Sequence, residues 1–125
     1  MPKHPVFIHS SLMEQLVKEA SIFKRQRMNY IFHQLEDAAN RILNPIESES
    51  YIQPHRHVEP PCDEASLVLR GLGAILLFND DGVVKYGFVL DSASENLGLD
   101  IPAGWYHTTV SVERGSVFYE VKAGP

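Results

Sequence analysis

The feature that most constrains the fold is a series of short apolar runs that fills the chain from Asn40 onward. The runs are separated by turn signals, and they cover residues 41–46, 51–57, 65–69, 74–78, 83–90, 97–101, 107–112 and 116–122. No helical pattern lies between them, and Asp81-Gly82 between two runs is a strong β-hairpin signal. Short strands at this spacing favour an antiparallel sandwich or barrel.

The first third of the chain has a helical pattern instead. Apolar residues recur at helical spacing at Leu12, Leu16, Val17, Ala20 and Phe23. Ser10 or Ser11 is the expected N-cap, Glu14 would complete a capping box, and the helix should end near the basic stretch 24–27. Residues 28–39 are compatible with a second short helix or with irregular structure. We therefore expect a mainly β protein, with a helical arm over 1–39 packed on a β-core over 40–125 as one folding unit.

Length and charge exclude several functional classes. A chain of 125 residues has room for one domain, and its formal net charge of −5 provides no electrostatic footprint for nucleic acid or an anionic membrane. The single cysteine, Cys62, excludes an intrachain disulfide and fits the cytoplasm. Its interpretation as a small buried residue is preferred to that of a nucleophile. No apolar run has the length of a transmembrane helix, and the N-terminus lacks the pattern of a signal peptide.

The histidines carry most of the functional signal. His55 and His57 lie two residues apart in a predicted strand, so their imidazoles should share one face. Glu64 opens the next strand, and His107 begins another after the turn Pro102-Ala103-Gly104. Neutral imidazole is the commonest transition-metal ligand in proteins. Three histidines and one carboxylate would leave room for water or substrate on the ion.

This arrangement resembles the two motifs of the cupin superfamily. The first is His-X-His followed by Glu64 and Gly71, and the second is Pro-X-Gly-X-X-His at 102–107. The first motif departs from the usual pattern, because six residues separate His57 from Glu64, which is more than cupins usually have. The closer resemblance is to the WbuC-type cupin-fold metalloproteins, which are associated with polysaccharide gene clusters. The matching stretches are 27–33, 51–57, 77–82, 100–102, 107–108 and 120–125.

The resemblance implies a small antiparallel jelly-roll barrel that holds one divalent metal ion, with zinc, iron, manganese and nickel all open. The implied ligands are His55, His57, Glu64 and His107. Glu59 is a rival for the carboxylate position because it lies close to His57. Glu64 is preferred because its spacing to Gly71 matches the motif.

Three further residues are candidates for contact with a substrate. Tyr51 and Gln53 share strand parity with His55, so we expect them to face the barrel interior, with ordinary barrel filling as the alternative. His33 lies in a stretch that matches the family and is a candidate to reach the barrel mouth. A structural role for His33 is the preferred interpretation.

The function these residues favour is that of a metal-dependent enzyme acting on a small, sugar-derived metabolite. An isomerase, an epimerase and an oxygenase all remain open. The alternative is a non-catalytic cupin that binds or senses a small molecule through its metal. We also expect a homodimer, because the predicted face around Leu67 and Leu69 is apolar.

Overall fold

The computed structural model describes residues 4–56 and 61–124, which form a mainly β fold with one N-terminal helix. The elements are α1 (Ser10–Ile22), β1 (Tyr30–Ile31), β2 (Ala39–Ile46), β3 (Glu64–Arg70), β4 (Leu72–Phe78), β5 (Val84–Asp91), β6 (Gly98–Ile101), β7 (Tyr106–Ser111) and β8 (Ser116–Ala123). The described part of the chain contains no helix with the length and apolar character needed to cross a membrane.

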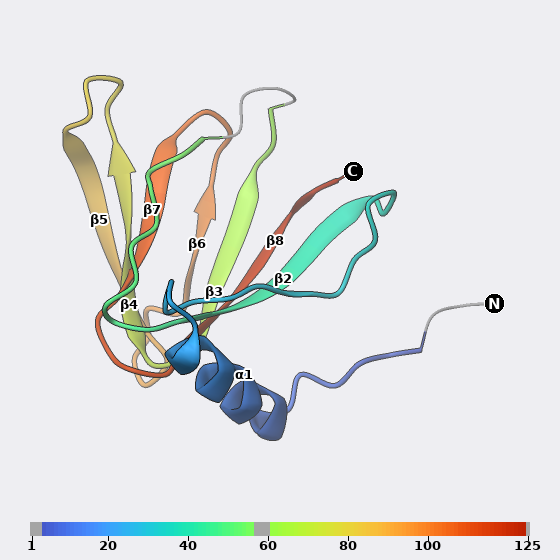
Figure 1. Cartoon of the computed structure of the whole chain (residues 1–125). Coiled ribbons are helices and arrows are strands. Elements are labelled where there is room, and N and C mark those ends of the chain that lie inside the picture. The colour runs from blue at the N-terminus through green and yellow to red at the C-terminus, as the bar shows by residue number, and fades with distance from the viewer. Residues whose placement is uncertain (1–3, 57–60, 125) are drawn as a thin grey trace.

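The strands form two antiparallel sheets (Figure 1). The larger has the order β1-β2-β8-β3-β6 and the smaller the order β5-β4-β7. The predicted hairpin at Asp81-Gly82 is confirmed, because it joins β4 to β5. Gly82 has φ +85°, a conformation that glycine adopts without steric cost, and the Asn79 N–H donates to the Val83 carbonyl at 2.8 Å.

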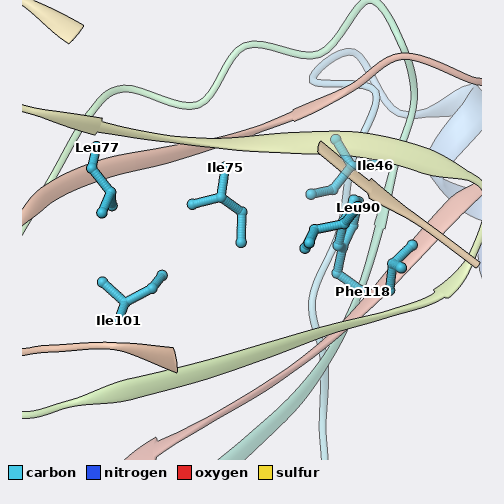
Figure 2. Packing of buried hydrophobic residues seen from close by; sticks show 7 residues of the cluster. Ile46, Ile75, Leu77, Leu90, Ile101 and Phe118 are labelled. Atoms are coloured by element: carbon cyan, nitrogen blue, oxygen red, sulfur yellow. The ribbon is translucent and has the colours of Figure 1, made fainter. Parts of the chain in front are cut away.

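The main hydrophobic core lies between the two sheets (Figure 2). Side chains that alternate along the strands meet there, namely Ile46, Val68, Ile75, Leu77, Leu90, Ile101 and Phe118. Phe118 is completely buried, and burying such a side chain contributes about 1.5–3 kcal/mol. The inner face of the larger sheet therefore packs on this apolar core.

A second cluster forms where α1 packs on the other face of the larger sheet. Leu16 of the helix lies against Leu43 and Val117, and all three are buried. Leu69 packs against the same cluster, so the expectation of an exposed face containing Leu69 is wrong for that residue. Leu67 is 46% exposed, as expected.

The N-terminal arm differs in detail from the prediction. The helix cap is His9 rather than a serine, because its Nδ1 accepts a hydrogen bond from the Ser11 N–H at 3.1 Å. The helix ends at Ile22, just before the basic stretch, as predicted. The following segment is not a second helix: Arg27 bridges to Ile46, and Tyr30–Ile31 pairs with β2. The arm therefore contributes an edge strand to the larger sheet.

The strand predicted over 51–57 is absent from its described part. Residues 51–56 contain one isolated bridge, between His55 and His107. Pro54 lacks an N–H donor, which is unfavourable inside a ladder. Exposure still alternates along this segment, but in the opposite sense to the expected one: Tyr51 is 74% exposed and Gln53 is exposed, whereas Ile52 packs against the core. The expectation that Tyr51 and Gln53 face the interior is wrong.

Candidate metal centre

The centre of the site is a pair of histidines brought together by a short backbone bridge. The His55 N–H donates to the His107 carbonyl at 3.0 Å, and the His107 N–H donates to the His55 carbonyl at 2.8 Å. The two imidazole rings lie with their centroids 4.5 Å apart. Although residues 51–56 form no strand, the bridge still places His55 directly beside β7.

Both imidazoles are held in the tautomer that a metal ligand needs. His55 Nδ1 lies 3.1 Å from the Gln53 carbonyl, and His107 Nδ1 lies 3.0 Å from the Trp105 carbonyl. Because a carbonyl oxygen only accepts, Nδ1 carries the proton in each neutral ring, and Nε2 presents its lone pair. Metal-ligating histidines typically donate their other ring N–H to a carbonyl or carboxylate in this way.

Glu64 adds an oxygen to these two nitrogens. It is the first residue of β3, it is buried, and its Oε2 lies 2.9 Å from His107 Nε2. One ligand atom from each of His55, Glu64 and His107 lies within 4.8 Å of the others. Ligands of one zinc-like ion each lie about 2.0–2.2 Å from it, so these three atoms could hold a single divalent cation after small side-chain adjustments. Two imidazoles and a carboxylate suit zinc, iron, manganese or nickel.

The other predicted site residues have different placements. His57 and Glu59 lie outside the described residues. His33 Nδ1 accepts from the Arg41 N–H at 3.0 Å, which ties it to the backbone of β2 in a structural role. Tyr51 and Gln53 line a surface pocket beside Tyr106. The structure therefore brings together three of the four predicted metal ligands.

A second carboxyl group, Glu120 on β8, and the carboxyl group of Glu64 change each other's pKa. Burial and the neighbouring Glu64 carboxylate raise the pKa of Glu120 to about 7. Burial would also raise the pKa of Glu64, but hydrogen bonds from His107 and Glu120 outweigh it and lower that pKa to about 2. Glu64 therefore carries the negative charge, while Glu120 retains a proton and donates it to Glu64. This arrangement keeps the ligand carboxylate ionised inside a buried site.

His107 responds to the same carboxylate. Burial acts to lower its pKa, but the hydrogen bond to Glu64 and the contact with the Trp105 carbonyl raise it above the ordinary value. Without metal, a protonated His107 can donate from Nε2 to Glu64. A metal ion would have to displace that proton, so protons and metal compete for the same nitrogen.

A cavity of about 180 Å³ opens beside His55 and Glu64. Its walls come from the inner face of the larger sheet, the segment before β1 and the segment before His55; they are Arg27, Met28, Asn29, Ile42, Asn44, Ile46, Ile52, His55, Glu64, Glu120 and Lys122. Asn44 is buried, and its Oδ1 has no hydrogen-bond partner within the described residues. The cavity is therefore polar at its wall and adjoins the possible metal ligands.

Among the cavity residues that were not predicted from the sequence are three charged residues and a buried asparagine. Arg27, Glu120 and Lys122 belong to stretches that match the cupin-fold metalloproteins, and Glu120 and Lys122 share strand parity with the core residue Phe118. That parity was the available signal. The pair Asn44-Pro45 is typical of a turn, but both residues lie inside β2. No signal in the sequence pointed to Asn44.

Comparison with known proteins places the chain in a family. The family model described as a domain of unknown function, DUF6016, matches residues 8–90, which is more than half of the chain. The chain therefore belongs to the DUF6016 family. No curated protein matches the chain.

Solved structures show that the fold is that of the cupins. A cupin superfamily protein from Desulfitobacterium hafniense is 17% identical, with a TM-score of 0.68 over 100% of this chain and 95% of its own. A conserved protein of unknown function from Streptococcus pyogenes is 18% identical, with a TM-score of 0.67 over 99% and 91%. Lactobacillus farciminis oxalate decarboxylase, crystallised as a formate complex, is 17% identical, with a TM-score of 0.64 over 82% of this chain and 30% of its own. At these identities the similarity establishes the fold alone.

Proposed function

We propose that this DUF6016 protein binds one divalent metal ion and uses it to act on a small, sugar-derived metabolite. The observation that carries the proposal is the convergence of His55, His107 and Glu64, with both imidazoles fixed to present Nε2. His57 is the proposed fourth ligand, because it follows His55 in the His-X-His pattern. The metal is zinc, iron, manganese or nickel.

A bound divalent ion would polarise a carbonyl or hydroxyl oxygen of the substrate, which suits isomerase, epimerase or oxygenase chemistry. The chain's own residues supply the surroundings. Glu64 supplies an ionised ligand oxygen, and the cavity wall beside it offers polar groups on β2 and β8. A pocket with a few convergent polar groups next to perturbed titratable residues is the usual setting of a binding or active site.

We also propose that the protein is a cytoplasmic WbuC-type cupin linked to surface polysaccharide biosynthesis. The support for the WbuC assignment is the set of matching stretches, which includes two residues of the metal centre, His55 and His107, and the charged cavity residues Arg27, Glu120 and Lys122. The support for a cytoplasmic location is the single cysteine, Cys62, which rules out an intrachain disulfide.

The first experiment measures the metal bound by protein expressed without added metal, using mass spectrometry. We expect about one ion per chain in the wild type and loss of the ion in His55→Ala and His107→Ala variants. His4→Ala is the matched control, because His4 is exposed on the arm. Full metal occupancy in a His55→Ala, His107→Ala double variant would contradict the proposed site.

The second experiment separates an enzyme from a binding protein. Metal-loaded protein is screened against nucleotide sugars and keto-sugars for thermal shifts, and each compound that stabilises the protein is incubated with it and examined for product. Conversion supports the enzyme. Stabilisation without conversion favours the alternative, a metal-dependent binding or sensing cupin.

A further inference from the structure

We propose that the cavity beside the metal centre binds the hydroxycarboxylate end of a sugar acid, with the carboxylate on Arg27 and the neighbouring hydroxyl on Asn44. This inference rests on the proposed function and names the substrate class for the same site. Two polar groups without partners, one donor and one acceptor, carry it.

The donor is Arg27, which precedes β1. Its Nε is buried and has no hydrogen-bond partner among the described residues. No carboxylate of the described residues lies within ion-pair distance of Arg27. Burial and the neighbouring cation Arg25 both lower the pKa of Arg27. A buried guanidinium N–H without an acceptor is costly, and a carboxylate is the acceptor that best matches guanidinium geometry.

The acceptor is Asn44 on β2, which is only 7% exposed. Its side-chain N–H group donates to Glu120, so Oδ1 must find another donor. No described residue supplies that donor. An unpaired buried carbonyl costs about 1–3 kcal/mol, and a ligand hydroxyl would satisfy it.

The strand register places these two groups next to each other. Arg27 is bridged to Ile46, and β1 continues the same register along β2 with Ile31 opposite Ile42. Asn44 is therefore the diagonal neighbour of Arg27, at about 7–8 Å in an antiparallel pair. Both residues line the same cavity. One ligand end that carries an anionic acceptor and an adjacent hydroxyl donor can reach both groups.

The charge balance of the cavity also favours an anion. Its ionisable side chains are Arg27, Lys122, Glu64 and Glu120, apart from His55. Even with both carboxyl groups ionised, these four charges sum to zero, and a divalent metal ion adds two positive charges. Lys122 acts on the two carboxyl groups, which leaves Arg27 as the cation available to a ligand. A neutral sugar would leave this positive charge uncompensated in a partly buried site.

The cavity volume limits the size of the ligand. A volume of about 180 Å³ is smaller than the roughly 300–1,000 Å³ of sites for drug-sized molecules, so the cavity suits a small ligand. The cavity extends from Arg27 and Asn44 to His55 and Glu64. A short polyhydroxy acid anchored at its acidic end therefore projects its remaining hydroxyls toward the metal centre.

The test uses metal-loaded protein whose metal content is measured separately, with titration calorimetry of four probes. The probes are gluconate, 2-deoxygluconate, the neutral polyol glucitol and glucose 6-phosphate. We expect gluconate to bind at least tenfold more tightly than glucitol, which lacks the carboxylate, and than 2-deoxygluconate, which lacks the hydroxyl assigned to Asn44. Arg27→Met should weaken gluconate binding about tenfold or more without changing metal content, whereas Arg25→Met, at an exposed neighbouring arginine, should not.

Equal binding of gluconate and glucitol would overturn the inference, as would equal weakening by Arg27→Met and Arg25→Met. Tighter binding of glucose 6-phosphate would assign the site to a phosphate instead. Because the ligand-side comparisons use the wild type, they decide the question even if Arg27→Met fails to fold. If the wild-type protein bound no metal, the proposed function would be overturned. If it bound metal but did not prefer gluconate to glucitol, this inference alone would be overturned.

Discussion

Replacing Glu120 with Gln should stabilise the metal-free protein at pH 8 and leave its stability at pH 5 nearly unchanged. In the folded protein Glu120 holds a proton that it donates to Glu64, and it accepts a hydrogen bond from Asn44. A glutamine side chain has the same shape, with an N–H to donate and an oxygen to accept. It therefore reproduces the protonated carboxyl group at every pH.

The size of the effect follows from the shift in the pKa of Glu120, which burial and Glu64 raise from 4.5 to about 7. Between these two values the folded state binds a proton that the unfolded state has released, so stability is lost as the pH rises. At about 1.4 kcal/mol per pKa unit, the loss by pH 8 is on the order of 3 kcal/mol. For a chain of this length that corresponds to a melting temperature about 10 °C lower.

His107 adds to the same trend. Because Glu64 raises its folded pKa, its contribution to stability is complete below the unfolded value of 6.5 and is lost as the pH rises through the folded value. Glu64 does not change the stability of the protein between pH 5 and pH 8. Its folded pKa is about 2, so the stability that its charge contributes is present above pH 4.5 and is lost only in stronger acid. The Glu120→Gln variant should therefore keep a shallower decline between pH 5 and pH 8 than the wild type.

The assay is thermal unfolding followed by circular dichroism in the presence of a chelator, from pH 5 to pH 8. Glu95→Gln, at an exposed loop position, is the matched control and should follow the wild type. If Glu120→Gln and the wild type lost the same stability over this range, Glu120 would not hold the proton. The assignment of the charge to Glu64 would then fail as well.

Three further predictions address the metal, a turn and the assembly. Bound metal should stabilise the folded protein by about 2.7 kcal/mol at a hundredfold excess over Kd. This stabilisation should be present at pH 7–8 and fall away as the pH drops through about 6 to 5, because the ligand histidines must be neutral to bind metal. Paired melting curves with and without chelator check it, and a difference between them that stays constant down to pH 5 would exclude histidine ligands. Gly71→Ala should lower the free energy of unfolding, measured in urea, by about 1–3 kcal/mol, because Gly71 has φ +87° and a Cβ there would lie 2.8 Å from Ser116 Cα. The control Gly82→Ala has a similar φ of +85° but open space around it, so it should lower that free energy by less. Equal losses in the two variants would show that the contact with Ser116 does not matter. We expect a dimer by light scattering at micromolar concentration, weakened by Leu67→Lys, and a monodisperse wild-type monomer would reject the dimer.

Local patterns in the sequence determined the elements that depend on short-range chemistry. The alternation of apolar runs and turns predicted the mainly β fold, and Asp81-Gly82 predicted the β4–β5 hairpin, because these signals act within a few residues. The resemblance to the two cupin motifs also predicted Glu64 and His107 as ligands, two residues that the structure brings together. In each case the information lies in the segment itself.

The tertiary structure alone decided how the segment before β3 lies and what surrounds the metal centre. Tyr51 and Gln53 are exposed while Ile52 packs against the core, and His55 reaches the site through its bridge to His107. Glu120 and Asn44 are adjacent only because β2 pairs with β8, and Arg27 joins them only because the arm continues the register of β2. Long-range strand register determines which polar groups share a cavity and how their charges act on one another. A pattern that repeats every two residues is unchanged by a shift of two residues, so it does not select among such registers.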